Sequence, residues 1–311
     1  MPDMRDALLS FGEQIAEGAA AASSVAVPPY RRVISCGMGG SSIAGEMLSM
    51  VQQDVVIHWD YDLPHNASGG DLVVCTSWSG NTEETISSFE AAQKLGLDTL
   101  VISSGGTLSE LATEAGTPFV KLPQPAPVPR AYVGLMGGAL LTALGHGERL
   151  PSSLDTDAIR QQAESLAGAV TDKMLAMYAA HPWRKLTGFW KMAYSETTKR
   201  QVMAGWFPST AHIEVVGWEG PYRDMVAPVL LRDADDDPRY AKNFDALLAI
   251  LARKGYSVQT IELSGNTVLE KVFGNYLLAL WTGYQVATAL GVDPQATELL
   301  DEFKALKAKT E

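Results

Sequence analysis

The first half of the chain alternates short apolar runs, which are typical of strands, with segments of helical spacing. The predicted strands are residues 32–36, 54–59, 71–76, 99–103 and 118–121. The predicted helices are residues 43–51, 81–95, 108–115 and 131–144. Strands that alternate with helices indicate a parallel sheet covered on both faces, with right-handed crossovers. The pattern therefore predicts an α/β fold with a doubly wound parallel sheet.

The second half repeats this pattern. Its predicted helices are residues 157–181, 189–202, 241–255 and 268–290, with a last helix at 296–309. Its predicted strands are residues 213–216, 226–231 and 257–263. The opening strand of this half is expected at residues 181–187, although they are less apolar than a central parallel strand should be.

Composition marks a boundary between the halves. Prolines at positions 123, 125, 127 and 129 cannot continue a helix and predict an extended connector. The sequence then turns polar at residues 151–155. A chain of 311 residues is long enough for two domains. We therefore predict a first domain at residues 1–150, which includes the connector, and a second at residues 151–311, each with its own doubly wound parallel sheet.

Composition also argues against several classes of function. The formal net charge of −12 repels phosphate backbones, so no nucleic-acid partner is expected. The N-terminus carries acidic residues, unlike a secretion signal, and the longest uncharged stretches, 131–145 and 277–292, are shorter than the roughly 18 apolar residues of a membrane span. These stretches predict no membrane partner. Cys36 and Cys75 end apolar runs and are expected to be reduced core residues, which indicates a cytoplasmic protein. The sequence contains no Cys/His cluster, so no metal site is predicted.

Two loops rich in Gly, Ser and Thr follow predicted strands. They are residues 37–42, Gly-Met-Gly-Gly-Ser-Ser, and residues 77–82, Ser-Trp-Ser-Gly-Asn-Thr. Both lie at carboxyl ends of parallel strands, where open α/β sheets bind ligands, and both lead into a helix, whose first N–H groups favour an anion. Three hydroxyl side chains of the second loop surround Gly80, whose backbone freedom suits a close approach. We predict that the loops bind phosphate; plain helix capping is the alternative.

The first loop also resembles a dinucleotide-binding fingerprint. Gly37-x-Gly39-x-x-Ser42 has glycine at the first two of the three glycine positions of that fingerprint. Asp60 stands about where the ribose-binding acid is expected. The third position is serine instead of glycine or alanine. A dinucleotide site also gives the second loop no role, so the pair of loops favours a sugar phosphate.

Both loops resemble those of the sugar isomerase (SIS) domain family. More narrowly, the whole chain resembles the bifunctional phosphoglucose/phosphomannose isomerases, which have two SIS domains in about this length. The stretches beyond the loops that carry the resemblance are Pro129-Arg130-Ala131-Tyr132-Val133-Gly134, Ser195-Glu196-Thr197-Thr198-Lys199, His212-Ile213-Glu214-Val215-Val216-Gly217-Trp218, and Lys304 after Asp293-Pro294. The resemblance implies two flavodoxin-like SIS domains and a C-terminal helix.

The function that the resemblance implies is the isomerisation of hexose 6-phosphates, from glucose 6-phosphate or mannose 6-phosphate to fructose 6-phosphate, in glycolysis or gluconeogenesis. The implied phosphate-binding residues are Gly40, Ser41, Ser77, Ser79 and Thr82. The implied catalytic residues are Glu196 as proton shuttle, Arg130 as stabiliser of the enediolate, and His212 and Lys304 in ring opening. The resemblance also implies a homodimer that shares its active sites through the histidine, with no cofactor and no metal.

These residue types suit the reaction. One carboxylate can take a proton from a carbon and return it to the neighbouring carbon through a cis-enediol, if it lies within hydrogen-bond reach of both. A guanidinium keeps its charge beside the enediolate oxygens. An imidazole, which titrates near neutrality, can move the proton that opens the pyranose ring.

Each catalytic candidate has a plainer interpretation when it is taken alone. Glu196 could pair with a basic residue on its own helix, and His212 and Lys304 could be solvated side chains. Arg130 could cap a helix. Only their order along the chain, together with the loops, favours the functional interpretation.

The sequence departs from the pattern of the family at three positions. Ser195, Thr197 and Ile213 stand where that pattern has asparagine. These departures leave the preferred hexose open. The alternative function is a sugar-phosphate-binding SIS protein that is non-catalytic or of different specificity; an NAD-binding enzyme is the less favoured alternative.

Overall fold

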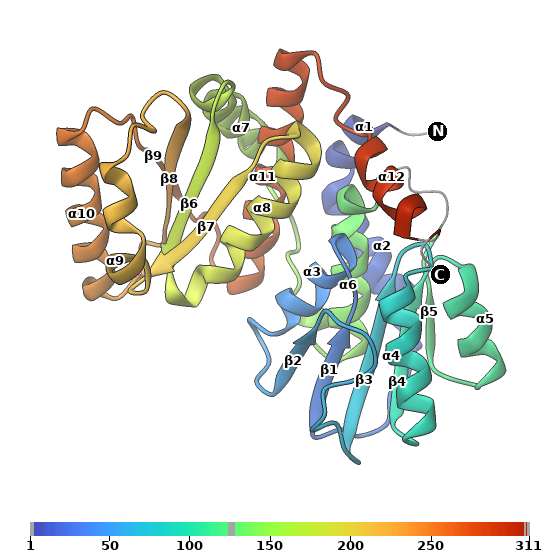
Figure 1. Cartoon of the computed structure of the whole chain (residues 1–311). Helices are drawn as coiled ribbons and strands as arrows, with labels where there is room; N and C mark the ends of the chain where they lie inside the picture. The colour runs from blue at the N-terminus through green and yellow to red at the C-terminus, as the bar shows by residue number, and fades with distance from the viewer. Residues whose placement is uncertain (1–2, 124–127, 308, 310–311) are drawn as a thin grey trace. The chain divides into compact units, whose positions relative to one another are not determined.

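The computed structural model describes residues 3–123, 128–307 and 309, and Figure 1 shows the elements that they form. The chain divides into two compact units, each with its own sheet. The first unit consists of residues Met1–Thr156 and Ser264–Gly274, and the second of Asp157–Leu263 and Asn275–Glu311.

Some predicted features fall on residues outside these described ranges. Pro125 and Pro127 of the predicted connector, and Ala308 of the predicted last helix, lie outside the described residues. Within the described ranges, no helix has the length and apolar character that crossing a bilayer requires.

The first unit is built around a parallel sheet in the order β2-β1-β3-β4-β5. Its elements in chain order are α1 (Met4–Leu9), α2 (Phe11–Ala22), β1 (Arg32–Cys36), α3 (Gly40–Leu48), β2 (Val55–His58), β3 (Asp71–Ser77), α4 (Glu83–Lys94), β4 (Asp98–Ser103), α5 (Gly106–Glu114), β5 (Phe119–Lys121), η1 (Pro129–Tyr132), α6 (Val133–Ala143) and η2 (Gly147–Arg149). The central strand β3 is buried along its whole length. Phe89 of α4 and Leu108 of α5 complete a core with Val73 of β3.

The strand order of this sheet defines a ligand-binding edge. β1 pairs with β2 on one side and with β3 on the other, so the chain leaves β1 in one direction and later crosses to the opposite side. Open sheets with this flavodoxin-like order bind ligands beyond the carboxyl ends of β1 and β3, where the strand order reverses. Both predicted phosphate loops follow these two strands, so the fold places them at this edge.

The second unit is built around a parallel sheet in the order β7-β6-β8-β9. Its elements are α7 (Thr156–Val170), β6 (Met174–Ala180), η3 (His181–Trp183), α8 (Arg184–Thr198), β7 (Val202–Phe207), α9 (Thr210–Ile213), η4 (Val215–Glu219), β8 (Val226–Arg232), α10 (Pro238–Arg253), β9 (Gln259–Glu262), α11 (Val268–Leu290) and α12 (Glu298–Lys307). α11 begins in the first unit and continues in the second. Two parallel-sheet units with helices confirm the predicted α/β class.

The opening strand of the second unit corrects two predictions. The predicted helix 157–181 ends at Val170, and Met174–Ala180 forms the central strand β6. The sequence Met-Leu-Ala-Met-Tyr-Ala-Ala consists largely of good helix formers, but burial between two neighbouring strands outweighs this preference. The strand expected at 181–187 is also wrong, because η3 and the start of α8 occupy those residues. Their low apolar content therefore says nothing about the sheet.

A further correction concerns the edge of this sheet. Residues 213–216, predicted as a strand, lie in α9 and η4, and the edge strand is β7. The side chains of Ile213 and Val216 are 65% and 70% exposed, so this β-branched run finds no place in the sheet core. The predicted helix 189–202 overlaps β7 at Val202.

Candidate functional site

The loop between β3 and α4 brings two predicted phosphate-binding hydroxyls together. The Oγ of Ser77 lies 2.8 Å from the Oγ1 of Thr82 and accepts the N–H of Gly80 at 3.1 Å. Thr82 is the N-cap residue of α4, so this hydroxyl pair sits beside the N–H groups of the first turn. Ser79 is exposed, and its Oγ accepts the N–H of Asn81 at 3.2 Å.

The loop between β1 and α3 joins the same edge. The N–H of Trp78 donates to the Oγ of Ser41 at 3.2 Å, which ties the start of α3 to the second loop. The hydroxyl hydrogen of Ser41 stays available as a donor, because its oxygen is the acceptor in this bond. A Cβ on Gly37 would lie 2.8 Å from the carbonyl oxygen of Thr76, so the two strands approach closely where they end. Ser41, Ser77 and Thr82 thus lie at one edge of one sheet.

Gly80 is required by the geometry of the second loop. Its φ of +69° lies in the left-handed region, and a Cβ there would overlap the carbonyl oxygen of Gly105 in the loop after β4. A side chain at this position would push the loop after β4 away from the hydroxyl cluster. The glycine of the motif is therefore a packing requirement as well as a turn residue.

Arg130 lies against the first turn of α3. A Cβ on Gly40 would come within 3.2 Å of the Cα of Arg130, so the two backbones touch with no side chain between them. Arg130 is 3% exposed, and arginines are seldom buried so deeply in proteins. The rings of Trp78 and Tyr132, two residues further on, lie 5.3 Å apart. The first unit therefore holds Arg130 beside both phosphate loops.

The two cysteines lie below these loops in the sheet. Cys36 of β1 and Cys75 of β3 are paired in register, and both are free and buried. A hydrogen bond with Cys36 and burial raise the pKa of the Cys75 thiol well above its ordinary value. A protonated, inaccessible thiol is unreactive, so their place is in the core.

The other three catalytic candidates belong to the second unit. Glu196 is half-buried in the last turn of α8, where Lys199 donates its Nζ to the carbonyl oxygens of Glu196 and Ala296, each at 2.6 Å. His212 is exposed on α9. Lys304 is exposed on α12, none of whose described side chains is buried.

The segment that carries His212 is anchored to β7 by the groups around Gly205. A Cβ on this glycine would lie 2.7 Å from the Oγ1 of Thr210 and 2.8 Å from the Oε2 of Glu214. Burial raises the pKa of Glu214, an effect that the hydroxyl of Tyr178 partly opposes. Among the described groups, the buried hydroxyl of Thr210 has no hydrogen-bond partner.

The residues next to Glu196 differ in their surroundings. The hydroxyl of Ser195 is buried and has no hydrogen-bond partner in the described part of the chain. The hydroxyl of Thr197 donates to the carbonyl oxygen of Ala193, as is common inside a helix. Ser195 therefore leaves an unused polar group beside the predicted proton shuttle.

Sequence reasoning missed a third loop at the same edge of the first sheet. It follows β4 and packs under the second loop: the Oδ1 of Asn81 accepts the N–H and the hydroxyl of Thr107 at 3.1 Å and 3.3 Å. Ser104, in the same loop, bonds to Trp78. The run Ser-Ser-Gly-Gly-Thr at residues 103–107, at a third neighbouring strand end, was the available signal.

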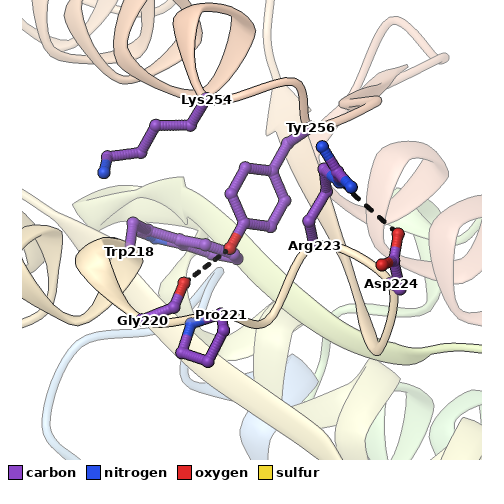
Figure 2. A pocket seen from close by; sticks show the side chains of 7 residues that line it. All are labelled: Trp218, Gly220, Pro221, Arg223, Asp224, Lys254 and Tyr256. Carbon is purple, nitrogen blue, oxygen red and sulfur yellow. Dashed lines mark hydrogen bonds and ion pairs between the residues drawn. The ribbon is translucent and has the colours of Figure 1, made fainter.

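A pocket of about 280 Å³ opens in the second unit (Figure 2), and none of the predicted site residues lines it. It is lined by Trp218, Gly220, Pro221, Arg223, Asp224, Lys254 and Tyr256. The rings of Trp218 and Tyr256 meet edge to face at 4.9 Å and are almost wholly buried, and Arg223 faces Asp224 at 3.4 Å. The lining residues precede β8 and β9, so the pocket lies at the amino edge of the sheet, opposite to the edge that binds ligands in such folds.

No three His, Cys, Asp or Glu side chains come together as a metal site within residues 3–123, 128–307 and 309.

Comparison with known proteins finds relatives that are similar over most of the chain. The family described as "Bacterial phospho-glucose isomerase C-terminal SIS domain" matches residues 159–306. A bifunctional phosphoglucose/phosphomannose isomerase of Aquifex aeolicus is 29% identical over 291 residues, which cover 89% of this chain and 90% of the relative. The chain is similar over most of its length to the bifunctional phosphoglucose/phosphomannose isomerases, and its second half matches a SIS-domain family. A D-glucosamine-6-phosphate 4-epimerase of Sulfolobus acidocaldarius is 23% identical over 89% of this chain and 90% of its own.

Solved structures agree with the fold. A hypothetical protein from Thermus thermophilus has a TM-score of 0.71 at 15% identity, covering 98% of this chain and 90% of its own. The C-terminal domain of glucosamine-fructose-6-phosphate aminotransferase from Francisella tularensis has a TM-score of 0.68 at 13% identity, covering 94% of this chain and 97% of its own. At these identities the likeness concerns the fold alone.

Proposed function

We propose that this SIS protein is a hexose-phosphate isomerase that interconverts glucose 6-phosphate or mannose 6-phosphate and fructose 6-phosphate. The observation that carries the proposal is the hydroxyl cluster of Ser41, Ser77 and Thr82 at two helix starts, on the ligand-binding edge of a flavodoxin-like sheet. Hydroxyls and main-chain N–H groups of this kind suit a phosphate dianion. The names of the relatives, among them the isomerase of Aquifex aeolicus, support the same class of substrate.

The proposed roles follow the chemistry of the isomerisation. The phosphate is held by Gly40, Ser41, Ser77, Ser79 and Thr82. Arg130, buried beside the loops, supplies a permanent positive charge for the enediolate. Glu196 transfers the proton between C1 and C2 through a cis-enediol, and its carboxylate serves both carbons in turn. His212 and Lys304 open the sugar ring.

We further propose that the protein works as a homodimer in the cytoplasm. His212 lies on a segment, residues 203–216, that exposes large apolar side chains: Met203, Trp206, Ile213 and Val216. Solvent-exposed apolar side chains in such number favour a protein partner, and a second copy would cover them. The imidazole of His212 would then serve the active site of the partner.

The isomerase is tested by exchange in deuterated water. Purified protein is incubated with fructose 6-phosphate in D2O, and the aldose product is analysed by NMR. Proton transfer through an enediol places deuterium at C2 of glucose 6-phosphate or mannose 6-phosphate. Phosphate binding without turnover would replace the isomerase by a sugar-phosphate sensor, and NAD binding without sugar-phosphate affinity would replace both.

A sugar-phosphate enzyme of different specificity is the second candidate. It is favoured by Ser195, Thr197 and Ile213, which stand where the family pattern has asparagine, and by the likeness to a protein named as a 4-epimerase. The same NMR experiment with glucosamine 6-phosphate separates the two: a new resonance of an epimer at C4, with no ketose formed from glucose 6-phosphate, would select the second candidate.

A further inference from the structure

We infer that Ser104 is a positioning residue for the proposed phosphate site, and that it acts by fixing the peptide of Trp78. The inference rests on the proposed function, because it assigns a role to the loop that would hold the phosphate. Ser104 lies in the loop after β4 and is 2% exposed, so it supports the loop from inside the protein.

The peptide groups of Trp78 are held on both sides. Its carbonyl oxygen accepts the N–H of Ser104 at 3.1 Å and the hydroxyl of Ser104 at 2.6 Å. Its N–H donates to the Oγ of Ser41 at 3.2 Å. Segments after three neighbouring strands, β1, β3 and β4, thus meet at this one residue.

The position of Trp78 in the chain gives these bonds their importance. Trp78 separates Ser77 from Ser79, two proposed phosphate ligands, and its own side chain is 6% exposed and packs on Tyr132. The carbonyl of Trp78 belongs to the same peptide plane as the N–H of Ser79. Holding that carbonyl therefore fixes the direction of an N–H group in the phosphate loop.

The expected effect is on binding rather than on chemistry. The phosphate takes no part in bond breaking, so the loop contacts it equally in the ground state and the transition state, and loosening the loop weakens both. Such a change raises KM and leaves kcat unaltered. The N–H of Ser104 still reaches the Trp78 carbonyl when the hydroxyl is removed, so the variant keeps one of the two bonds and is expected to fold.

The experiment compares Ser104→Ala, Ser104→Cys and the control Ser88→Ala. Ser88 is also buried in the first unit, and its hydroxyl donates to the carbonyl oxygen of Glu84 at 3.0 Å, within α4. For each purified variant, calorimetry gives the Kd of inorganic phosphate, kinetics gives KM and kcat for fructose 6-phosphate, and the melting temperature reports folding.

We expect Ser104→Ala to raise the Kd of phosphate and KM in parallel, by about three- to tenfold, with kcat within about twofold of the wild type. Ser104→Cys, with its weaker donor, should lie between Ser104→Ala and the wild type. Ser88→Ala should change neither constant, even if it lowers the melting temperature by a similar amount.

Three results would overturn the inference: an unchanged Kd and KM in Ser104→Ala, a loss confined to kcat, or an equal rise in Ser88→Ala. Wild-type protein that binds phosphate but does not turn over fructose 6-phosphate would refute the isomerase alone, because the effect of Ser104 on the Kd can still be measured. Wild-type protein that does not bind phosphate would refute both.

Discussion

The hydroxyls of Ser77 and Thr82 meet at 2.8 Å across the turn that joins β3 to α4. Ser77 ends the most deeply buried strand of its sheet, and Thr82 occupies the N-cap position of the helix that follows, so both adjoin regular structure. A bound phosphate would meet these hydroxyls without ordering them first, which lowers the entropic cost of binding.

Gly80 should be the least replaceable residue of the loop. Gly80→Ala places a Cβ onto the carbonyl oxygen of Gly105 at a φ of +69°, so the loop must move, and we expect kcat/KM for fructose 6-phosphate to fall by about 100-fold or more. Gly96→Ala is the matched control, because Gly96 has a φ of +64° but open space around its Cα. That variant should lose stability and keep its activity. Equal activities in the two variants would contradict a phosphate loop here.

Glu196→Gln should separate catalysis from binding. The amide cannot accept the carbon-bound proton, so kcat should fall by about 10²- to 10⁴-fold. The Kd of inorganic phosphate should stay at the wild-type value, because the phosphate loops lie in the first unit. Glu164→Gln, an exposed position on α7, serves as control and should leave both quantities unchanged. Wild-type turnover in Glu196→Gln would place the proton shuttle on another residue.

The segment around His212 should form the dimer contact. Val216→Asp introduces a charge among the exposed apolar side chains, so we expect the protein to elute at the mass of one protomer in size-exclusion chromatography with light scattering, and to lose activity with it. Leu95→Asp, at an exposed apolar position of the first unit, should stay dimeric and active. An active Val216→Asp monomer would refute a shared active site.

Asp71 should make the stability of the first unit depend on acid. Burial favours its neutral form, but hydrogen bonds from Arg32, the N–H of Ser68 and Arg31 outweigh burial and lower its pKa. Because the pKa is lower in the folded state, the stabilisation is complete above the ordinary pKa of aspartate, about 4, and is lost as the pH falls through the folded value. Thermal melts of the wild type at pH 3–7 measure this dependence.

The corresponding variant is Asp71→Asn, which should lower the free energy of unfolding by about 1–3 kcal/mol at pH 7 and flatten the acid dependence. Asp157→Asn removes the partner of Arg160 in an exposed pair on α7 and should have little effect, since surface pairs contribute under about 1 kcal/mol. An acid dependence that is unchanged in Asp71→Asn would assign it to other carboxyl groups.

The strands that the sequence predicted well are those whose residues favour strands by themselves. Arg32–Cys36 and Asp71–Ser77 are rich in β-branched residues and end at Gly/Ser loops, so local pattern and burial agree. β6 was missed because its Met, Leu and Ala residues favour a helix, and only its neighbours β7 and β8 make it a strand. The edge strand β7, which lies next to β6, was also missed.

The candidate site also contains some contacts that the sequence predicts and others that it does not. The hydroxyls of Ser77 and Thr82 are close in sequence, so their meeting could be predicted from the chain alone. The bond between Ser104 and Trp78 depends on β4 lying next to β3, which no local pattern contains. Glu196 and His212 were identified only through the resemblance, since each alone looks like an ordinary surface residue.

The sharpest test of phosphate binding by the two loops is a crystal structure with fructose 6-phosphate. We expect the phosphate oxygens to lie within about 3.2 Å of the hydroxyls of Ser41, Ser77 and Thr82, with the sugar carbons beside Arg130. Phosphate bound elsewhere, for example between Arg223 and Lys254 in the pocket of the second unit, with these hydroxyls unoccupied, would contradict it.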